Sequence, residues 1–284
     1  MMVCSLAVAL PAPGESVVIN EFLASNRAGL VDGDGKASDW IELYNAGPAS
    51  VSLGGWHLTD SPADPRKWSF PAGIVLPARQ YLIVFASGRT IDDSSYVDGK
   101  GCLHTNFSLD KDGEYLALVA PDGAVVHAYA PRYPPQQTDV SHGLWQGAAR
   151  YFAPPTPGKA NGPGFPGFVE PTVPSHARGF YGQPFELQLS CGTPEALIRY
   201  TRDGSEPTAQ HGTIYQPGTP ILVTTTTQVR SAAFKTGWRT ASATTHTYIF
   251  VDHVARQPAH PLGWPADWGY DSEVRGLVPA DYAM

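Results

Sequence analysis

Residues 39–45 read Asp-Trp-Ile-Glu-Leu-Tyr-Asn, a stretch in which side chains of two kinds alternate. In an extended chain Ile41 and Leu43 would lie on one face, and Trp40 and Glu42 on the other, because successive side chains of a strand point to opposite faces. This period of two predicts a half-buried β-strand.

Similar stretches occur on both sides of this one. In the first half of the chain, further strands are predicted at Val17–Leu23, Val51–Leu58, Lys67–Phe70, Tyr81–Ala86, Glu114–Val119 and Ala124–Tyr129. In the second half they are predicted at Pro184–Ser190, Leu197–Thr201, Pro220–Val223, Thr226–Lys235 and Thr244–Phe250. Short strands at turn-punctuated spacing are typical of antiparallel sandwiches.

The length and composition agree with an all-β fold. The chain has 284 residues, which suggests two domains, each large enough to bury its own core. It contains 29 Gly and 27 Pro, residues that punctuate strands and break helices. No stretch of about 12 residues shows a helical apolar period free of both. We therefore predict an all-β protein with two antiparallel β-sandwiches in series.

The Pro- and Gly-rich stretch Pro154–Pro174 marks the boundary between the domains. We predict a first module at 16–161, a linker at 162–167, a second module at 168–251 and an irregular tail at 252–284. Residues 1–15 contain a short apolar run that ends in small residues and Pro, as the end of a secretory signal does, but no basic segment precedes it. A remnant of a signal segment and a plain terminus both fit.

Charge and motifs exclude several classes of protein. The net charge is −7 and no dense cluster of Lys or Arg exists, so we predict no nucleic-acid partner. No apolar run is long enough to span a membrane. The three cysteines, Cys4, Cys102 and Cys191, are too widely spaced to indicate a disulfide framework or a CxxC site. GxSxG, HExxH, Walker and protein-kinase signatures are missing, and we predict a protein that is not an enzyme.

A loop just before the 39–45 stretch is a candidate calcium site. Asp32, Asp34 and Asp39 fall within eight positions of a Gly-containing loop, and carboxylate oxygens suit Ca²⁺. The helix-loop-helix calcium pattern fails here, because Lys36 and Leu43 stand where acidic or amide ligands are required. Two interpretations stay open: an irregular calcium site, or a solvated turn whose Asp side chains bond to local backbone. No other cofactor is predicted.

A second candidate site lies in the second module. Tyr200 and Trp238 could stack on a sugar ring, and Asp203 or Glu206 could accept hydrogen bonds from its hydroxyl groups. The alternative is that the two aromatic side chains only pack at the core or rim of a sandwich.

The motifs of the first module carry a resemblance to a known family. They are VINEFLASN, DWIELYN, VSLGGWHLTD, KWSFPAGIVLPARQYLIVFASG, HTNFSLDKDGEYLAL and PTPGKAN, in that order. This succession resembles the lamin-tail domain of bacterial surface and secreted proteins and covers nearly the whole module. The resemblance implies an immunoglobulin-like sandwich used for interaction, without catalytic residues.

The second module has a resemblance of its own, carried by VEPTVPS, FELQLSC, IRYTRDGSEPT, TQVRSAAFKTGW and TYIF. This set is similar to the chitobiase/β-hexosaminidase C-terminal domain, an immunoglobulin-like accessory of secreted carbohydrate-active enzymes. The tail resembles the stretch that leads into a spore coat protein H kinase-like domain in multi-domain bacterial proteins.

Together the two resemblances imply a secreted or cell-surface protein. We expect a non-catalytic adhesion or spacer segment that positions a partner domain or binds a surface polysaccharide or protein ligand. Two alternatives are a carbohydrate-binding accessory region of a larger secreted enzyme, and the N-terminal non-catalytic part of a spore coat protein H kinase-like protein.

Overall fold

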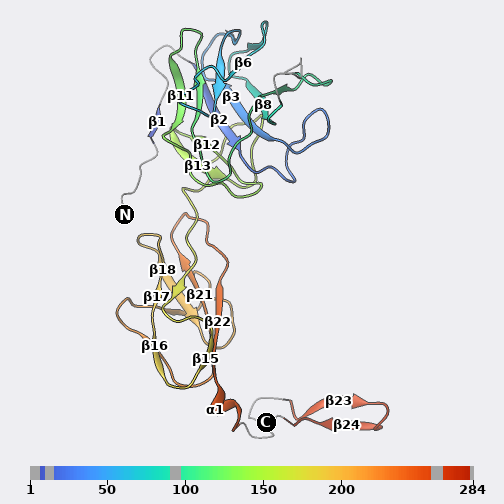
Figure 1. The fold of residues 1–284 in the computed structure, drawn as a ribbon, viewed down its shortest axis with the longest axis vertical. Helices are drawn as coiled ribbons and strands as arrows, with labels where there is room; N and C mark the ends of the chain where they lie inside the picture. Colours follow the sequence, from blue (N-terminus) through green and yellow to red (C-terminus); the bar gives the residue numbers. More distant parts are fainter. Residues whose placement is uncertain (1–6, 10–15, 90–96, 257–264, 282–284) are drawn as a thin grey trace. The chain divides into compact units, whose positions relative to one another are not determined.

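A computed structural model describes residues 7–9, 16–89, 97–256 and 265–281 (Figure 1). The chain divides into two compact units, residues 1–166 and 167–284. Apart from one helical turn, α1 (Val251–Val254), the regular elements of the described residues are β-strands. The predicted all-β class, with two immunoglobulin-like sandwiches in series, is confirmed.

The first unit is a two-sheet sandwich. Its strands are β1 (Ala7–Ala9), β2 (Val17–Leu23), β3 (Asp39–Asn45), β4 (Val51–Ser52), β5 (His57–Thr59), β6 (Trp68–Ser69), β7 (Val75–Leu76), β8 (Tyr81–Ala86), β9 (Leu103–His104), β10 (Leu116–Val119), β11 (Val125–Ala130), β12 (Ser141–Trp145) and β13 (Ala148–Phe152). One sheet has the order β1-β11-β10-β5-β6, the other β13-β12-β2-β3-β8-β9, and β4 pairs with β7. Neighbouring strands are antiparallel, except for β8 and β9.

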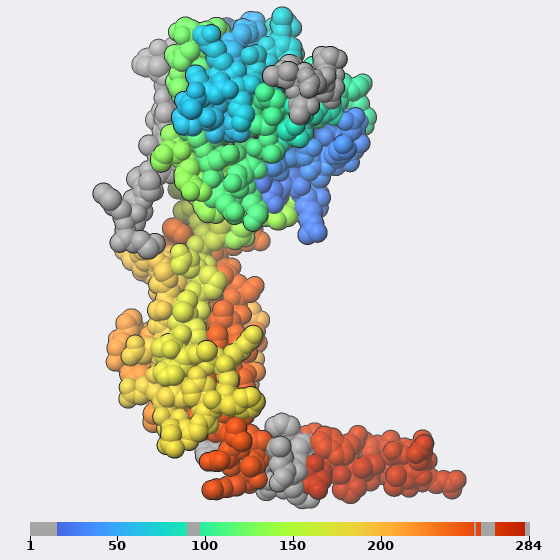
Figure 2. Space-filling model, in the orientation of Figure 1, coloured from blue at the N-terminus to red at the C-terminus, as the bar shows by residue number. Residues whose placement is uncertain are grey.

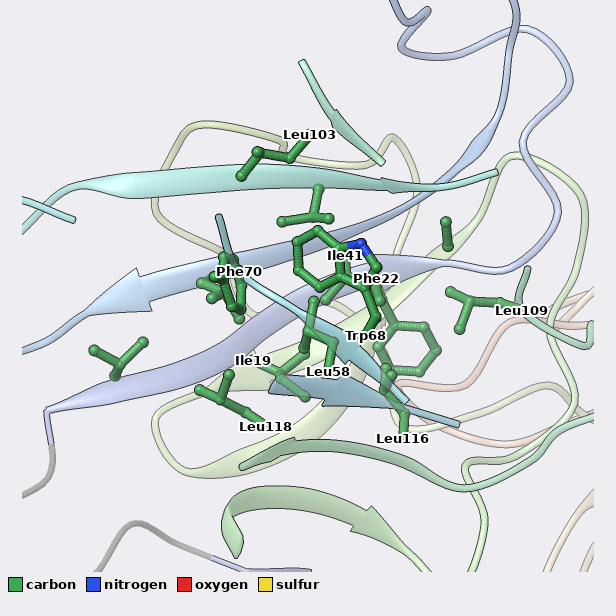
Figure 3. Close-up of a cluster of buried hydrophobic side chains, with 14 of the residues drawn as sticks. Ile19, Phe22, Ile41, Leu58, Trp68, Phe70, Leu103, Leu109, Leu116 and Leu118 are labelled. Carbon is green, nitrogen blue, oxygen red and sulfur yellow. The ribbon is translucent and has the colours of Figure 1, made fainter. Parts of the chain in front are cut away.

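The core of this unit lies between the two sheets (Figure 3). Ile19 and Ile41 of one sheet meet Leu58 and Leu118 of the other, and Trp68 fills the space beside them. All five are essentially inaccessible to solvent. Since full burial of such a side chain contributes roughly 1.5–3 kcal/mol, this layer is the main source of the unit's stability.

Strand β3 departs from the sequence-based expectation. Ile41 and Leu43 face the core as predicted, but Trp40 and Glu42 on the opposite face are also fully buried. Trp40 packs there with Leu23 and Phe85 in a separate apolar cluster. The prediction of a half-buried strand was wrong because alternation does not reveal the loops that cover the second face.

A β-bulge in β2 decides which side chains share that second face. Ile19 pairs with Leu43 and Glu21 with Glu42, so the register shifts by one residue at Asn20. In a regular strand Ile19 and Glu21 would point to the same side. The extra residue lets Ile19 face the core while Glu21 lies on the opposite face beside Glu42.

The second unit is a smaller sandwich. Its strands are β14 (Val173–Pro174), β15 (Gly179–Tyr181), β16 (Phe185–Leu187), β17 (Leu189–Ser190), β18 (Leu197–Thr201), β19 (Thr213–Ile214), β20 (Ile221–Val223), β21 (Thr227–Phe234) and β22 (Thr244–Phe250). The main sheet has the order β15-β22-β21-β18-β19, and β16-β20 and β14-β17 form two-stranded sheets. Its core includes Leu187, Val223, Val229 and Tyr248.

Two predicted strands are each divided in the structure. Val51–Leu58 becomes β4 and β5, separated by a turn in which Gly55 adopts a φ of 82°. Pro184–Ser190 becomes β16 and β17, which pair with β20 and β14 respectively. In each case, a stretch predicted as one strand contains two strands that belong to different sheets.

The C-terminal tail, predicted to be irregular, contains α1 and a hairpin of β23 (Asp267–Asp271) and β24 (Gly276–Pro279). The predicted signal remnant falls outside the described residues except for β1, and Cys4 also lies outside them. Cys102 and Cys191 are free thiols. Within the described ranges no helix is long and apolar enough to cross a membrane.

Candidate functional site

Two buried glutamates lie side by side in the first unit. Glu21 and Glu42 are direct cross-strand partners, and neither side chain is accessible to solvent. The Glu21 carboxylate accepts hydrogen bonds from Ser141 Oγ, from Thr156 N at 2.9 Å and from Thr156 Oγ1 at 2.8 Å. The Glu42 carboxylate accepts from Asn20 Nδ2 at 2.7 Å and from Gly158 N. We call Glu21, Glu42, Thr156 and Gly158 the glutamate clasp.

Burial dominates the electrostatics of the clasp. Burial is the main reason that the pKa of both carboxyl groups is raised; the pKa of Glu42 reaches about 7, and the charge of Glu21 contributes to that rise. Paired carboxylates can serve acid-base catalysis. These two, however, are closed off from solvent and bond to the chain's own backbone. Their arrangement anchors the segment that follows β13 onto two strands in the interior of the sheet.

Asn161 extends this anchor. Its Nδ2 donates to Asn20 O at 3.1 Å and to Leu144 O at 2.8 Å, and its Oδ1 lies 2.9 Å from Thr156 Oγ1. The stretch 155–161, PTPGKAN, is thus joined to β2, β3 and β12 by side-chain and backbone hydrogen bonds. Sequence reasoning singled out this motif without identifying its partners, because the glutamates are 116 and 135 positions away.

The predicted calcium loop joins β2 to β3 and projects from the body of the first unit, where it is blue in Figure 2. Asp32 Oδ1 accepts from Asp34 N at 3.0 Å and from Lys36 N at 2.9 Å, and Oδ2 accepts from Ser38 Oγ at 2.9 Å. Both oxygens of Asp32 therefore have partners within the loop itself, as in a side-chain-stabilised turn.

The other two carboxylates of this prediction also have partners. Asp34 forms an ion pair with Arg89, and Asp39 Oδ1 accepts from Asn26 N at 3.0 Å. Burial raises the pKa of Asp39 to about 6. No group of three or more His, Cys, Asp or Glu able to hold a metal ion occurs among the residues that the structure describes. Calcium binding by Asp32, Asp34 and Asp39 stays a prediction.

Asp98 is a buried carboxylate of this region that sequence reasoning missed. Its Oδ2 lies 3.1 Å from His104 Nε2 and accepts from Gly33 N at 2.7 Å, while Oδ1 accepts from Cys102 N at 3.0 Å. Burial acts to raise the pKa of Asp98, but these hydrogen bonds together hold it well below its usual value. Asp98 ties the predicted calcium loop to the segment before β9.

The second unit has an open pocket of about 540 Å³ beside β18 and β19. Tyr200 and Asp203, two of the four predicted sugar-binding residues, line it together with Arg202 and His211. Asp203 Oδ1 accepts from Ser205 Oγ and Ser205 N, which lowers the pKa of Asp203. The pocket therefore presents a tyrosine, a carboxylate, a guanidinium and an imidazole.

The other two predicted sugar-binding residues are not among those that line this pocket. Glu206 Oε2 lies 3.3 Å from Arg230 Nη2 in an ion pair. Trp238 packs against the core of the second unit, with Lys235 Nζ 4.8 Å from its ring centroid. The structure thus brings Tyr200 and Asp203 together, and sugar binding by the four residues stays a prediction.

Comparison with known families agrees with both resemblances. Residues 11–132 match the model of the Lamin Tail Domain. This range is similar to a lamin tail domain. Residues 176–247 match the Chitobiase/beta-hexosaminidase C-terminal domain. Both are immunoglobulin-like accessory domains, and no curated protein matches the chain.

The match to the lamin tail domain ends before β12. Strands β12 and β13 nevertheless complete one of its two sheets, and Thr156 and Gly158 of the clasp bond to glutamates inside the matched range. The first unit therefore consists of the matched range together with residues from beyond it. The two family matches do not test the resemblance of the tail to spore coat protein H kinase-like proteins. They also do not test whether the protein is bacterial.

Proposed function

We propose that this chain is a non-catalytic adhesion and spacer segment that works outside the cytoplasm, where it positions a partner domain or binds a surface ligand. The observation that carries the proposal is the succession of two accessory modules, each with its own core. An extracellular setting is supported by the family match of the second module, a domain type associated with extracellular enzymes.

The glutamate clasp gives this role a mechanical basis. A spacer transmits force through the segment by which the chain leaves each module. In the first unit that segment is held by Glu21 on β2 and Glu42 on β3, which lie in the interior of a sheet and are covered on both faces. Tension at the end of the unit would therefore act on two strands in the interior of a sheet.

Single-molecule force spectroscopy on the full chain tests this role. We expect two separate unfolding events, of which one shifts to lower force in Glu42→Ala. Glu206→Ala, which alters an exposed ion pair in the other unit, serves as the control. If Glu42→Ala leaves both forces unchanged, the clasp does not carry load and the spacer proposal loses its mechanical support.

The pocket of the second unit favours a second candidate function, a carbohydrate-binding accessory region of a larger secreted enzyme. An aromatic side chain with several hydrogen-bonding groups, such as Tyr200 with Arg202 and Asp203, suits a sugar ring and its hydroxyl groups. A glycan array would decide between the two candidates. Reproducible binding to one class of polysaccharide, lost in Tyr200→Ala and Asp203→Ala, would replace the pure spacer role with this one.

A third candidate is the non-catalytic front of a spore coat protein H kinase-like protein. It is compatible with the spacer role, because a segment in that position would hold a following domain at a distance. Its support is the resemblance of the tail sequence alone.

A further inference from the structure

Loops of the first unit enclose a pocket of about 360 Å³ on the face of β2 and β3 that is turned away from the core. Leu23 and Trp40 lie at its base, where both side chains are closed to solvent. Its volume lies within the range of small-ligand pockets, roughly 300–1,000 Å³. Neither predicted binding site includes these residues.

One side of the pocket is a loop wall containing Ala28, Gly29 and Leu30. Asn26 holds this wall in place. Its Nδ2 donates to Leu30 O at 2.6 Å and to Ser38 O at 2.8 Å, and its Oδ1 accepts from Gly29 N at 3.0 Å. These hydrogen bonds lie within the protein, so the loop wall keeps its conformation without a ligand.

A second side is formed by Pro154, Pro155 and Pro157. Thr156 and Gly158 adjoin these prolines and are held by hydrogen bonds to Glu21 and Glu42. Proline rings also restrict the backbone φ. The proline wall is therefore preformed, and a ligand entering the pocket would lose little affinity to ordering it.

Among the residues that line the pocket, Asp139 alone carries a charge. Its Oδ1 accepts from Arg27 N at 2.7 Å and from Ala28 N at 2.9 Å, and these bonds lower its pKa. In the described part of the chain, Asp139 Oδ2 accepts no hydrogen bond and the Arg27 side chain makes no ion pair with it. An ionised carboxylate with one unused oxygen thus borders an otherwise apolar pocket.

We propose that this pocket binds a small organic cation, an apolar ring that carries an ammonium group. The ring would pack between the loop wall and the proline wall, and the ammonium group would donate to Asp139 Oδ2. Charge complementarity decides this class of ligand, because a neutral compound would forgo the charge-assisted bond and an anion would be repelled.

Ligand-observed NMR on the full chain, with phenethylammonium as the probe, tests the proposal. We expect saturation transfer to its ring protons at millimolar concentration. Binding should be about tenfold weaker for the neutral analogue 2-phenylethanol. The anion 3-phenylpropionate should show none. Absence of transfer to phenethylammonium, or equal binding of all three probes, would overturn the proposal.

Asp139→Asn provides the decisive variant. Asparagine keeps an oxygen for the two backbone donors and tolerates the φ of 59° at this position, so the fold is preserved while the charge is removed. We expect affinity for phenethylammonium to fall about tenfold and affinity for 2-phenylethanol to stay the same. The matched control is Asp122→Asn, since Asp122 Oδ1 also accepts a turn amide but lies outside the pocket lining. Equal loss in both variants would exclude a specific role for Asp139.

A blocking variant tests the place of binding independently of charge. Ala28 is exposed and lines the pocket, so Ala28→Trp should occupy it and abolish binding of both the ammonium and the alcohol. Ala124→Trp, on the exposed turn between β10 and β11, is the control. Unchanged binding in a folded Ala28→Trp protein would mean that the cation binds elsewhere.

Discussion

Glu21 and Glu42 are cross-strand partners whose carboxylates are both fully buried, side by side, in the first unit. Two adjacent buried carboxylates are costly unless hydrogen bonds or protonation offset their charge. Donors from Ser141, Thr156, Asn20 and Gly158 surround the pair, and burial raises the pKa of each glutamate, which favours the protonated form.

The first prediction concerns the hydrogen bonds of the clasp. Glu42→Ala removes the acceptor of Gly158 N and the shorter of the two side-chain contacts of Asn20 Nδ2, which keeps only Asn161 Oδ1 at 3.4 Å. Because a poorly satisfied donor in the interior costs about 1–3 kcal/mol, urea denaturation should show a loss of that size in the stability of the first unit. Glu42→Gln, which keeps an acceptor oxygen, should lose less. A loss as large in Glu42→Gln would show that charge matters more than hydrogen bonding.

The second prediction concerns pH. The pKa of Glu42 is raised from 4.5 to about 7 in the folded chain. Between these values the folded state binds more protons than the unfolded state, so the free energy of unfolding falls as pH rises from 4.5 to about 7. This contribution should be absent in Glu42→Gln. Melting temperatures of both proteins across the window would reveal the difference, and parallel curves would contradict it.

The third prediction concerns a buried histidine with the opposite pH dependence. Burial lowers the pKa of His127 from 6.5 to about 4, and neither ring nitrogen has a hydrogen-bond partner in the described structure. The unfolded chain takes up this proton first, so stability falls as pH drops from 6.5 to about 4. His127→Leu should reduce that acid sensitivity, as measured by melting temperature. The exposed His211 gives the control, and His211→Ala should behave like the parent protein.

The fourth prediction concerns the close approach of β12 to β2. A Cβ at Gly143 would lie 2.2 Å from Asn20 O and 2.8 Å from Glu21 Cα, both backbone atoms beside the bulge. Gly143→Ala should therefore destabilise the first unit by about 1–3 kcal/mol or more. Gly162→Ala meets no atom within 4 Å and should be nearly neutral in the same urea titration. A neutral Gly143→Ala would mean that the two strands separate easily.

The fifth prediction concerns the calcium loop. If Ca²⁺ binds there, millimolar Ca²⁺ should raise the melting temperature, a chelator should reverse the effect, and Asp32→Asn should abolish it. Because Asp32 already accepts three hydrogen bonds within the loop, the ion would have to displace at least one of them. An unchanged melting temperature and no heat in a calorimetric titration would leave the loop as a side-chain-stabilised turn.

The elements most easily predicted were those with a strong local pattern. Strands β2, β3 and β8 follow the predicted ranges, since alternation and turn residues act over only a few positions. Strands β12 and β13 were not predicted. Their sequence, SHGLWQGAARYF, has small and polar residues where an apolar alternation would be expected, and β12 owes its position to pairing with β2, about 120 residues earlier.

The all-β class and the order of the two modules could be predicted from the amino-acid sequence, because both depend on short-range periodicity, turn chemistry and family motifs. The partners of Glu21 and Glu42 became evident only from the folded chain. A bulge at Asn20 changes which face each side chain occupies, and no local pattern indicates that one residue has been added to a strand. The clasp and the pocket beside it arise from pairing across more than 100 residues, where proximity depends on the packed sandwich and not on neighbouring positions in the chain.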